Sequence, residues 1–203
     1  MNRLNYKCGS IGKRRYAAEP RQHAARGFTL TELVVTMSIV AILLAIGAPS
    51  FKYVTASNRA TSEVNGLLGD LQFARAEAIK EGQTVSVCPS LDGLTCSGNG
   101  AAWQTGWLVF SDTGTIGIID GTDFVVHSQR AFAGTDTLQA DNGVNVISFS
   151  REGFAMNLPS AVTFTLHDAS VTAPFTRCLS LTIVGALSTQ IGGGMTAENN
   201  PCN

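Results

Sequence analysis

An uncharged, almost wholly apolar run near the N-terminus constrains this chain of 203 residues more than any other feature. No charged residue occurs from Leu33 to Phe51, and residues 33–48 read LVVTMSIVAILLAIGA. Counted from Phe28, the 21 residues to Ala48 would span roughly 32 Å as a helix, which matches the hydrocarbon core of a bilayer. The run therefore predicts a helix able to cross a membrane.

Charge is distributed unevenly about this run. Residues 1–27 hold seven Lys or Arg and one Glu, a net charge of +6, whereas the rest of the chain carries −7. A basic segment before an apolar helix is typical of an N-terminus that stays in the cytoplasm while the remainder crosses the membrane. An ordinary secretory signal has the same charge order, and residues 45–48 (AIGA) would serve as a loose cleavage site. In that alternative the helix is removed from the mature protein.

The start of the apolar run carries a more specific pattern, RGFTLTEL at residues 26–33. With the residues that follow, over about 25 positions, it resembles the class III signal of type IV pilins and type II secretion pseudopilins. In that family a prepilin peptidase cuts after the glycine and methylates the new amine of the phenylalanine. The resemblance implies cleavage between Gly27 and Phe28, removal of a cytoplasmic leader of residues 1–27, and Glu32 as the fifth residue of the mature chain.

Glu32 is the one acidic residue inside the predicted membrane segment. An ionised carboxylate in an apolar helix costs roughly 3 kcal/mol unless it is partnered. In the family the partner is the amine of Phe28 on a neighbouring subunit, so the resemblance implies an assembly role that sets axial register. Taken alone, the residue has a second interpretation, because its position near the helix end allows the side chain to reach the cytoplasmic interface.

Helical patterning continues behind Pro49, which is predicted to bend or loosen the helix without ending it. An apolar face with i, i+3, i+4, i+7 spacing consists of Val64, Leu67, Leu68, Leu71, Ala74 and Ala78. A second face repeats every seventh residue and consists of Glu63, Asp70 and Glu77. We expect this acidic stripe to be a solvated surface, and Gly82 to end the helix. Residues 28–49 are the expected transmembrane half and residues 50–82 the amphipathic half.

After Gly82 the pattern changes to short β-like runs separated by Gly-, Asp- and Asn-rich turns. The predicted strands are residues 83–88, 106–111, 124–132, 144–150, 161–167 and 177–184. Turns of this composition favour antiparallel pairing. A long helix followed only by strands predicts an α+β fold, with the helix lying on a sheet face and a β-rich head of residues 83–203.

Several pieces of the head resemble the GspH/FimT group of minor pseudopilins and minor pilins. They are residues 73–90 (FARAEAIKEGQTVSVCPS), 106–112 (GWLVFSD), 147–155 (ISFSREGFA) and 177–185 (RCLSLTIVG). The resemblance implies the pilin fold and a structural role in a fibre. It implies as partners other pilin or pseudopilin subunits, the prepilin peptidase and methyltransferase, and the assembly platform of the bacterial inner membrane, in which the chain spans once with its head in the periplasm.

Five cysteines divide between the two sides of the membrane. Cys8 lies in the leader, on the reducing side, and is expected to stay a thiol. The other four form an even set in an exported domain, which favours disulfides. Of the three possible pairings we favour Cys88–Cys96, which closes the LDGLT loop, and Cys178–Cys202, which holds the C-terminal tail. A zinc site would need closely spaced Cys pairs or nearby histidines, and neither occurs, so no metal is expected.

No hydrolase, zinc-peptidase or nucleotide-binding motif occurs in the sequence, so we expect neither enzymatic activity nor a cofactor. The acidic turn residues Asp112, Asp120 and Asp123 are expected to shape turns and not to bind calcium. Both tryptophans, Trp103 and Trp107, are expected in the core. His127 is expected to be a surface or edge residue.

Two functions fit these features: a minor pseudopilin of the type II secretion system, in the periplasmic fibre that drives protein export across the outer membrane, or a minor type IV pilin in pilus biogenesis, adhesion, motility or DNA uptake. An anchored periplasmic receptor would leave the Gly27–Phe28 motif unexplained. FimT-like DNA-binding pilins carry a basic GRxR-type motif, whereas residues 185–188 here read GALS. Residues from Ser50 onward carry −6, so we expect no direct binding of nucleic acid.

Overall fold

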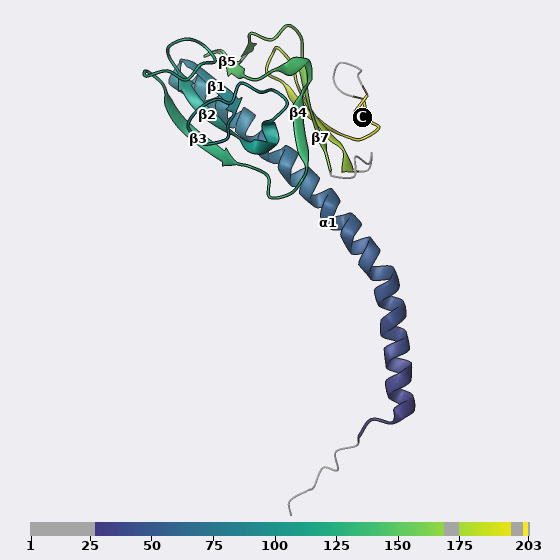
Figure 1. The fold of residues 1–203 in the computed structure, drawn as a ribbon. Helices are drawn as coiled ribbons and strands as arrows, with labels where there is room; N and C mark the ends of the chain where they lie inside the picture. Colours follow the sequence, from purple (N-terminus) through teal and green to yellow (C-terminus); the bar gives the residue numbers. More distant parts are fainter. Residues whose placement is uncertain (1–26, 169–174, 196–200, 203) are drawn as a thin grey trace, which may run out of the picture. The chain divides into compact units, whose positions relative to one another are not determined.

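The computed structural model describes residues 27–168, 175–195 and 201–202 (Figure 1). The chain divides into two compact units, Met1–Ala45 and Ile46–Asn203. One helix, α1 (Leu30–Glu81), contributes to both units and contains Pro49. Pro49 does not end the helix, as predicted, because helical hydrogen bonding resumes behind it. The leader predicted for residues 1–27 lies outside the described residues except for Gly27.

The described part of the first unit consists of residues 27–45, and helix α1 begins there at Leu30. Every one of these residues is exposed. Within the described residues, α1 is the one helix long and apolar enough to cross a membrane by length and composition. Residues 30–49 of the predicted transmembrane half thus lie on one continuous helix, which Phe28 and Thr29 precede.

The second unit combines the C-terminal part of α1 with two antiparallel sheets, which confirms the predicted α+β class. The first sheet has the order β3-β2-β1-β5-β6 and the second the order β4-β7-β8-β9. The strands are β1 (Thr84–Pro89), β2 (Gly106–Asp112), β3 (Phe124–Arg130), β4 (Thr137–Ala140), β5 (Ile147–Phe149), β6 (Ala155–Met156), β7 (Val162–His167), β8 (Arg177–Leu181) and β9 (Leu187–Ile191). Two short 3-10 helices, η1 (Trp103–Thr105) and η2 (Asp141–Gly143), join them.

All six predicted strands overlap observed ones, with β1 and β2 each ending one residue later than predicted, but the prediction missed β4, β6 and β9. β6 has two residues and β4 has four, too few to show an alternating pattern. β9 reads LSTQI and is at most half-buried, so it lacks the apolar alternation of a strand with one face in the core. It forms because β8 offers it a full register of pairs, from Arg177 opposite Ile191 to Leu181 opposite Leu187.

One hydrophobic core joins the helix to both sheets (Figure 1). The buried helix residues are Ala60, Val64, Leu67, Leu71, Ala74 and Ala78, which reproduce the predicted apolar face except that Leu68 is only partly buried and Ala60 extends it. Trp103 and Trp107 are both buried, as expected. The indole of Trp103 packs edge-on against Phe164 with ring centroids 4.9 Å apart, which ties η1 to the second sheet.

Candidate functional site: the anchor helix and its attachment to the head

The helix start carries a capping arrangement at the predicted processing site. Thr29 precedes the first helical residue, and its Oγ1 accepts a hydrogen bond from the backbone N–H of Glu32 at 3.2 Å. The carbonyl of Thr29 accepts the first helical bond, from Leu33 N at 3.1 Å. A threonine cap followed three residues later by glutamate is the sequence signature of a helix N-terminus. Gly27 and Phe28 thus lie just outside the helix, at an exposed backbone segment.

Glu32 is exposed in the first turn of α1. None of the described residues forms a salt bridge with its carboxylate. A negative charge in the first turn is favourable because the helix dipole is positive there. The side chain therefore has a local role in starting the helix and a charge that the described part of this chain does not neutralise.

The two hydroxyl residues inside the apolar run are satisfied within the helix. Thr36 Oγ1 donates to the carbonyl of Leu33 at 2.9 Å, and Ser38 Oγ donates to the carbonyl of Val34 at 2.8 Å. Bonds of this kind remove the cost of placing a hydroxyl in hydrocarbon. Polar side chains therefore do not prevent this segment from entering a bilayer or a bundle of apolar helices.

The acidic stripe is not the solvated surface that the sequence analysis expected. Glu63, Asp70 and Glu77 are each partly buried, because side chains of the head and of the helix itself cover this face. Trp107 Nε1 donates to Asp70 Oδ2 at 2.7 Å, and His127 Nε2 lies 3.4 Å from Asp70 Oδ1. Seven-residue spacing could not distinguish these positions from solvated ones, since the covering partners are distant in sequence.

Near the start of the buried helix face, two carboxylates lie close to one guanidinium. Arg59 donates to both oxygens of Asp136 at 2.7 Å, and the Asp136 side chain is fully buried. Glu63 Oε2 is also buried and has no hydrogen-bond partner. Burial, followed by the nearby charge of Asp136, raises the pKa of Glu63 from 4.5 to about 7. The ion pair between Arg59 and Asp136 therefore attaches the head to the helix, and Glu63 beside it titrates near neutral pH.

Two buried or half-buried arginines make further connections that sequence reasoning missed. Arg177 on β8 donates to Ser57 Oγ at 2.9 Å and to Thr61 Oγ1 at 3.2 Å, both on α1. Arg75 on α1 donates to the carbonyl of Gly185 at 2.9 Å. For Arg177 the sequence did hold a signal, because it is the one charged residue of its strand. A buried arginine must find hydrogen-bond acceptors.

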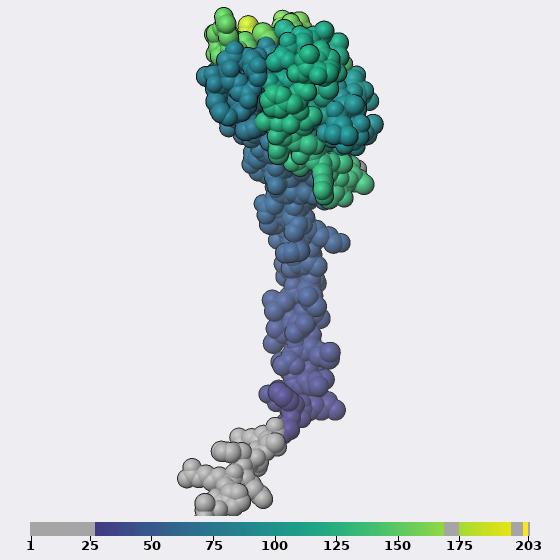
Figure 2. Space-filling view, turned by 90° about the vertical axis from the view of Figure 1, so that its left-hand side faces the viewer, coloured from purple at the N-terminus to yellow at the C-terminus, as the bar shows by residue number. Residues whose placement is uncertain are grey.

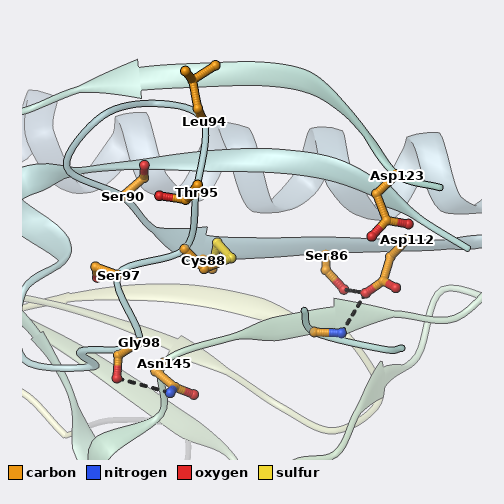
Figure 3. Close-up of a disulfide and its surroundings, with 12 residues drawn as sticks. Ser86, Cys88, Ser90, Leu94, Thr95, Ser97, Gly98, Asp112, Asp123 and Asn145 are labelled. Carbon is orange, nitrogen blue, oxygen red and sulfur yellow. Dashed lines mark hydrogen bonds between the residues drawn. A yellow bond between two sulfur atoms is a disulfide. The ribbon is translucent and has the colours of Figure 1, made fainter. Parts of the chain in front are cut away.

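The structure contains the two disulfides that the sequence analysis favoured, Cys88–Cys96 and Cys178–Cys202. The first closes a loop over the outer face of the first sheet (Figure 3). There Cys88 packs with Leu108 and Phe110 in a small separate core. The second attaches the C-terminal residues to β8, where Cys202 also exchanges backbone hydrogen bonds with Gly193 and Gly194 at 2.8 Å.

The acidic turn residues act as backbone acceptors. Asp120 accepts from Thr122 N at 2.8 Å, and Asp123 accepts from Thr113 N at 2.9 Å. Asp112 accepts from the Ser86 hydroxyl at 2.5 Å (Figure 3) and from Gly117 N at 2.6 Å. Burial raises the pKa of Asp112 above its ordinary value. These bonds explain the three carboxylates as turn-shaping groups.

An apolar N-terminal helix that continues into a disulfide-bonded antiparallel β head is the architecture of type IV pilin-like proteins. The family described as "Type II transport protein GspH" matches residues 63–185, more than half of the chain. The prokaryotic N-terminal methylation motif matches residues 22–48. The chain therefore belongs to the GspH family, whose members assemble with other pilin-type subunits and are processed by a prepilin peptidase.

Two similar solved structures are crystal forms of the type IV minor pilin FimU of Pseudomonas aeruginosa strain PAO1. The form in space group P21 is 20% identical, covers 69% of this chain and 92% of that chain, and has a TM-score of 0.50. The form in space group P65 is 21% identical, with coverages of 64% and 90% and a TM-score of 0.47. At this identity the first similarity establishes the fold alone. A comparison with curated proteins found no match.

Proposed function

We propose that this protein is a minor pseudopilin of the type II secretion system. In this proposal a prepilin peptidase removes residues 1–27 and the new amine of Phe28 is methylated. Residues 28–49 then anchor the chain in the inner membrane, with the head of residues 83–203 in the periplasm. The protein is a structural subunit and not an enzyme. The match of residues 63–185 to the family described as Type II transport protein GspH supports the role of a pilin-type subunit, which this proposal shares with the pilus candidate below.

The observation that carries the proposal is the large apolar surface that the chain leaves uncovered. Among the described residues, fifteen large apolar side chains between Phe28 and Val54 are at least half exposed. Fully burying each would contribute about 1.5–3 kcal/mol relative to leaving it in water. A membrane covers these apolar side chains before assembly, and a bundle of equivalent helices covers them in a fibre.

Glu32 supplies the specificity that apolar packing lacks. Its carboxylate has no ion-pair partner among the described residues, yet it belongs to an otherwise uncharged segment. Pairing with the amine of Phe28 on a neighbouring subunit would neutralise both charges. Because only one axial shift brings the two groups together, the pair would define the register between subunits.

A second candidate is a minor subunit of a type IV pilus, favoured by the shared fold with FimU over 92% of that chain. Deleting the gene separates the two candidates. The secretion proposal predicts loss of secreted enzymes from the medium with normal pili, and complementation by the intact gene. Loss of surface pili and twitching with normal secretion would favour the pilus candidate instead.

A further inference from the structure

The segment that leads from the first sheet to the second contacts helix α1 through a buried side chain. This β3–β4 connection consists of residues 131–136 (AFAGTD), between the end of β3 and the start of β4. Asp136 is its one buried residue, Phe132 is half-buried and the others are exposed. Figures 1 and 2 show this green connection at the edge of the head, beside the helix. The contacts of Asp136 therefore decide how the connection lies on the helix.

Asp136 forms an ion pair with the helix through both of its oxygens. Arg59 on α1 donates through Nε and Nη2 to the two carboxylate oxygens, each at 2.7 Å. The Asp136 side chain is fully buried, whereas that of Arg59 is 45% exposed. Beyond this pair, Gln104 accepts hydrogen bonds from the N–H groups of Phe132 and Leu138, at 3.0 and 3.2 Å. These two amides lie on either side of Asp136 in the sequence and report whether the connection stays in place.

A second carboxyl group lies beside the ion pair. Glu63 follows Arg59 by about one helical turn, and its Oε2 is buried without a hydrogen-bond partner. The charged groups that act on Glu63 are Asp136 and Arg59, and Asp168 acts on the same guanidinium. Ionisation of Glu63 therefore adds a half-buried negative charge that Arg59, already paired with Asp136, does not neutralise.

A proton on Glu63 removes the repulsion between the two carboxyl groups. The protonated group donates a hydrogen bond to Asp136, so that the contact becomes attractive. Burial, followed by the charge of Asp136, raises the pKa of Glu63 to about 7. The proton is therefore lost near neutral pH, and two like charges then face each other where water screens them poorly.

The connection is the part of this cluster that can move. Glu63 and Arg59 belong to a continuous helix, whereas residues 133–135 are exposed. An exposed segment with few buried contacts opens at a lower free-energy cost than a packed helix. Movement of Asp136 towards water separates it from Glu63 and leaves the helix and the buried core unchanged.

We propose that Glu63 and Asp136 form a pH-sensitive switch, which holds the β3–β4 connection on α1 while the two groups share a proton and releases it when that proton is lost. The connection is then attached in mildly acidic medium and opens more often in mildly basic medium. All of the groups involved belong to the second compact unit. The inference therefore goes beyond the proposed function and does not depend on it.

Amide hydrogen exchange of the full chain in detergent at pH 6 and pH 8 tests this switch. The rates at Phe132 and Leu138 are divided by the rate at Ala155, whose N–H donates to the carbonyl of Ile183 at 3.1 Å. This division cancels the base catalysis of exchange, which acts on every amide. We expect the ratio to rise about tenfold from pH 6 to pH 8 in the wild type. It should stay constant in Glu63→Gln, because glutamine keeps a donor for Asp136 and does not ionise.

Glu77→Gln is the matched control. Glu77 belongs to the same acidic stripe, and its side chain is 12% exposed and bonded to Lys80 at 2.7 Å. This variant should show the same rise as the wild type. A constant ratio in the wild type would overturn the inference, because the head would then open as a whole or not at all. An equal rise in Glu63→Gln would assign the pH dependence to another group and would overturn it as well.

Discussion

At the scale of single residues, Glu32 combines a local and an intermolecular role. Its backbone N–H is bonded to the Thr29 cap, while its carboxylate lacks an ion-pair partner among the described residues. The first role needs a residue that suits a first turn, and glutamine fills it almost as well as glutamate. The second role needs the negative charge. These requirements can be separated by substitution.

Glu32→Ala and Glu32→Gln should both insert into the membrane normally and both reduce incorporation into the fibre at least tenfold, because each removes the charge. Immunoblots of membrane and sheared fibre fractions measure the two quantities. If Glu32→Gln incorporates normally while Glu32→Ala does not, the residue serves helix initiation. Normal incorporation of both variants would leave Glu32 without an assembly role.

Glu63 makes the stability of the head depend on pH. Its pKa is raised from 4.5 to about 7, so the folded state favours the protonated form. The free energy that Glu63 contributes to folding is fully present below pH 4.5 and is lost as the pH rises to about 7. At higher pH the free energy of unfolding no longer depends on Glu63 protonation. The groups that face Glu63 are Arg59 on the helix and Asp136 from the β3–β4 connection, with Asp168 acting on Arg59.

We expect Glu63→Gln to remove this part of the pH dependence and to be more stable than the wild type at pH 8. Urea unfolding of the full chain in detergent, followed by tryptophan fluorescence at pH 5 and pH 8, provides the measurement. Glu152→Gln is the control, because hydrogen bonds from Arg151 and Ser150 lower the pKa of that exposed residue. If the free energy of unfolding changes by the same amount between pH 5 and pH 8 in the wild type and in Glu63→Gln, the assignment to Glu63 is contradicted.

At the scale of elements, the two disulfides constrain loops of different length. Their cysteines are 8 and 24 residues apart in sequence. Loop-closure entropy gives the shorter bond roughly 2.6 kcal/mol and the longer one roughly 3.5 kcal/mol. The longer bond also holds Cys202 against β8, beside its backbone hydrogen bonds with Gly193 and Gly194.

Replacing Cys178 and Cys202 by serine should therefore destabilise the head by about 3.5 kcal/mol, and replacing Cys88 and Cys96 by about 1 kcal/mol less. Equilibrium urea unfolding of the two double variants measures both. The reverse order would show that the small core around Cys88 depends on its disulfide more than loop length indicates.

Elements with a strong local pattern were predictable from the sequence, and those defined by distant partners were not. The helix face from Val64 to Ala78 follows from spacing alone. The division into two sheets and the strand β9 depend on which strands pair. No local sequence pattern indicates which strands will be neighbours. The burial of Asp70 was missed for the same reason, since Trp107 is 37 residues away.

At the scale of the whole molecule, the charge of the chain from Ser50 onward argues against nucleic-acid binding. Residues from Ser50 onward carry −6, and residues 185–188 (GALS) contain no arginine. The arginines nearest this stretch in sequence and space, Arg177 and Arg75, are occupied by contacts between the helix and the second sheet or its turns. Phosphate binding depends on cations that are free to release counterions.

A gel-shift assay with the full chain in detergent at about 150 mM salt should therefore show negligible retardation of double-stranded or single-stranded DNA. A DNA-binding pilin assayed alongside provides the positive control. Submicromolar binding that weakens with added salt would contradict this expectation and would favour a role in DNA uptake.

Every role proposed for this chain requires the apolar helix to stay on the mature protein as an anchor and assembly element. Mass spectrometry of the N-terminus of the membrane-purified chain tests this most directly. We predict that the mature chain begins with N-methylated Phe28, which leaves the whole of α1 in place. A mature chain that begins near Ser50 would show removal of the helix by an ordinary signal peptidase and would contradict the account.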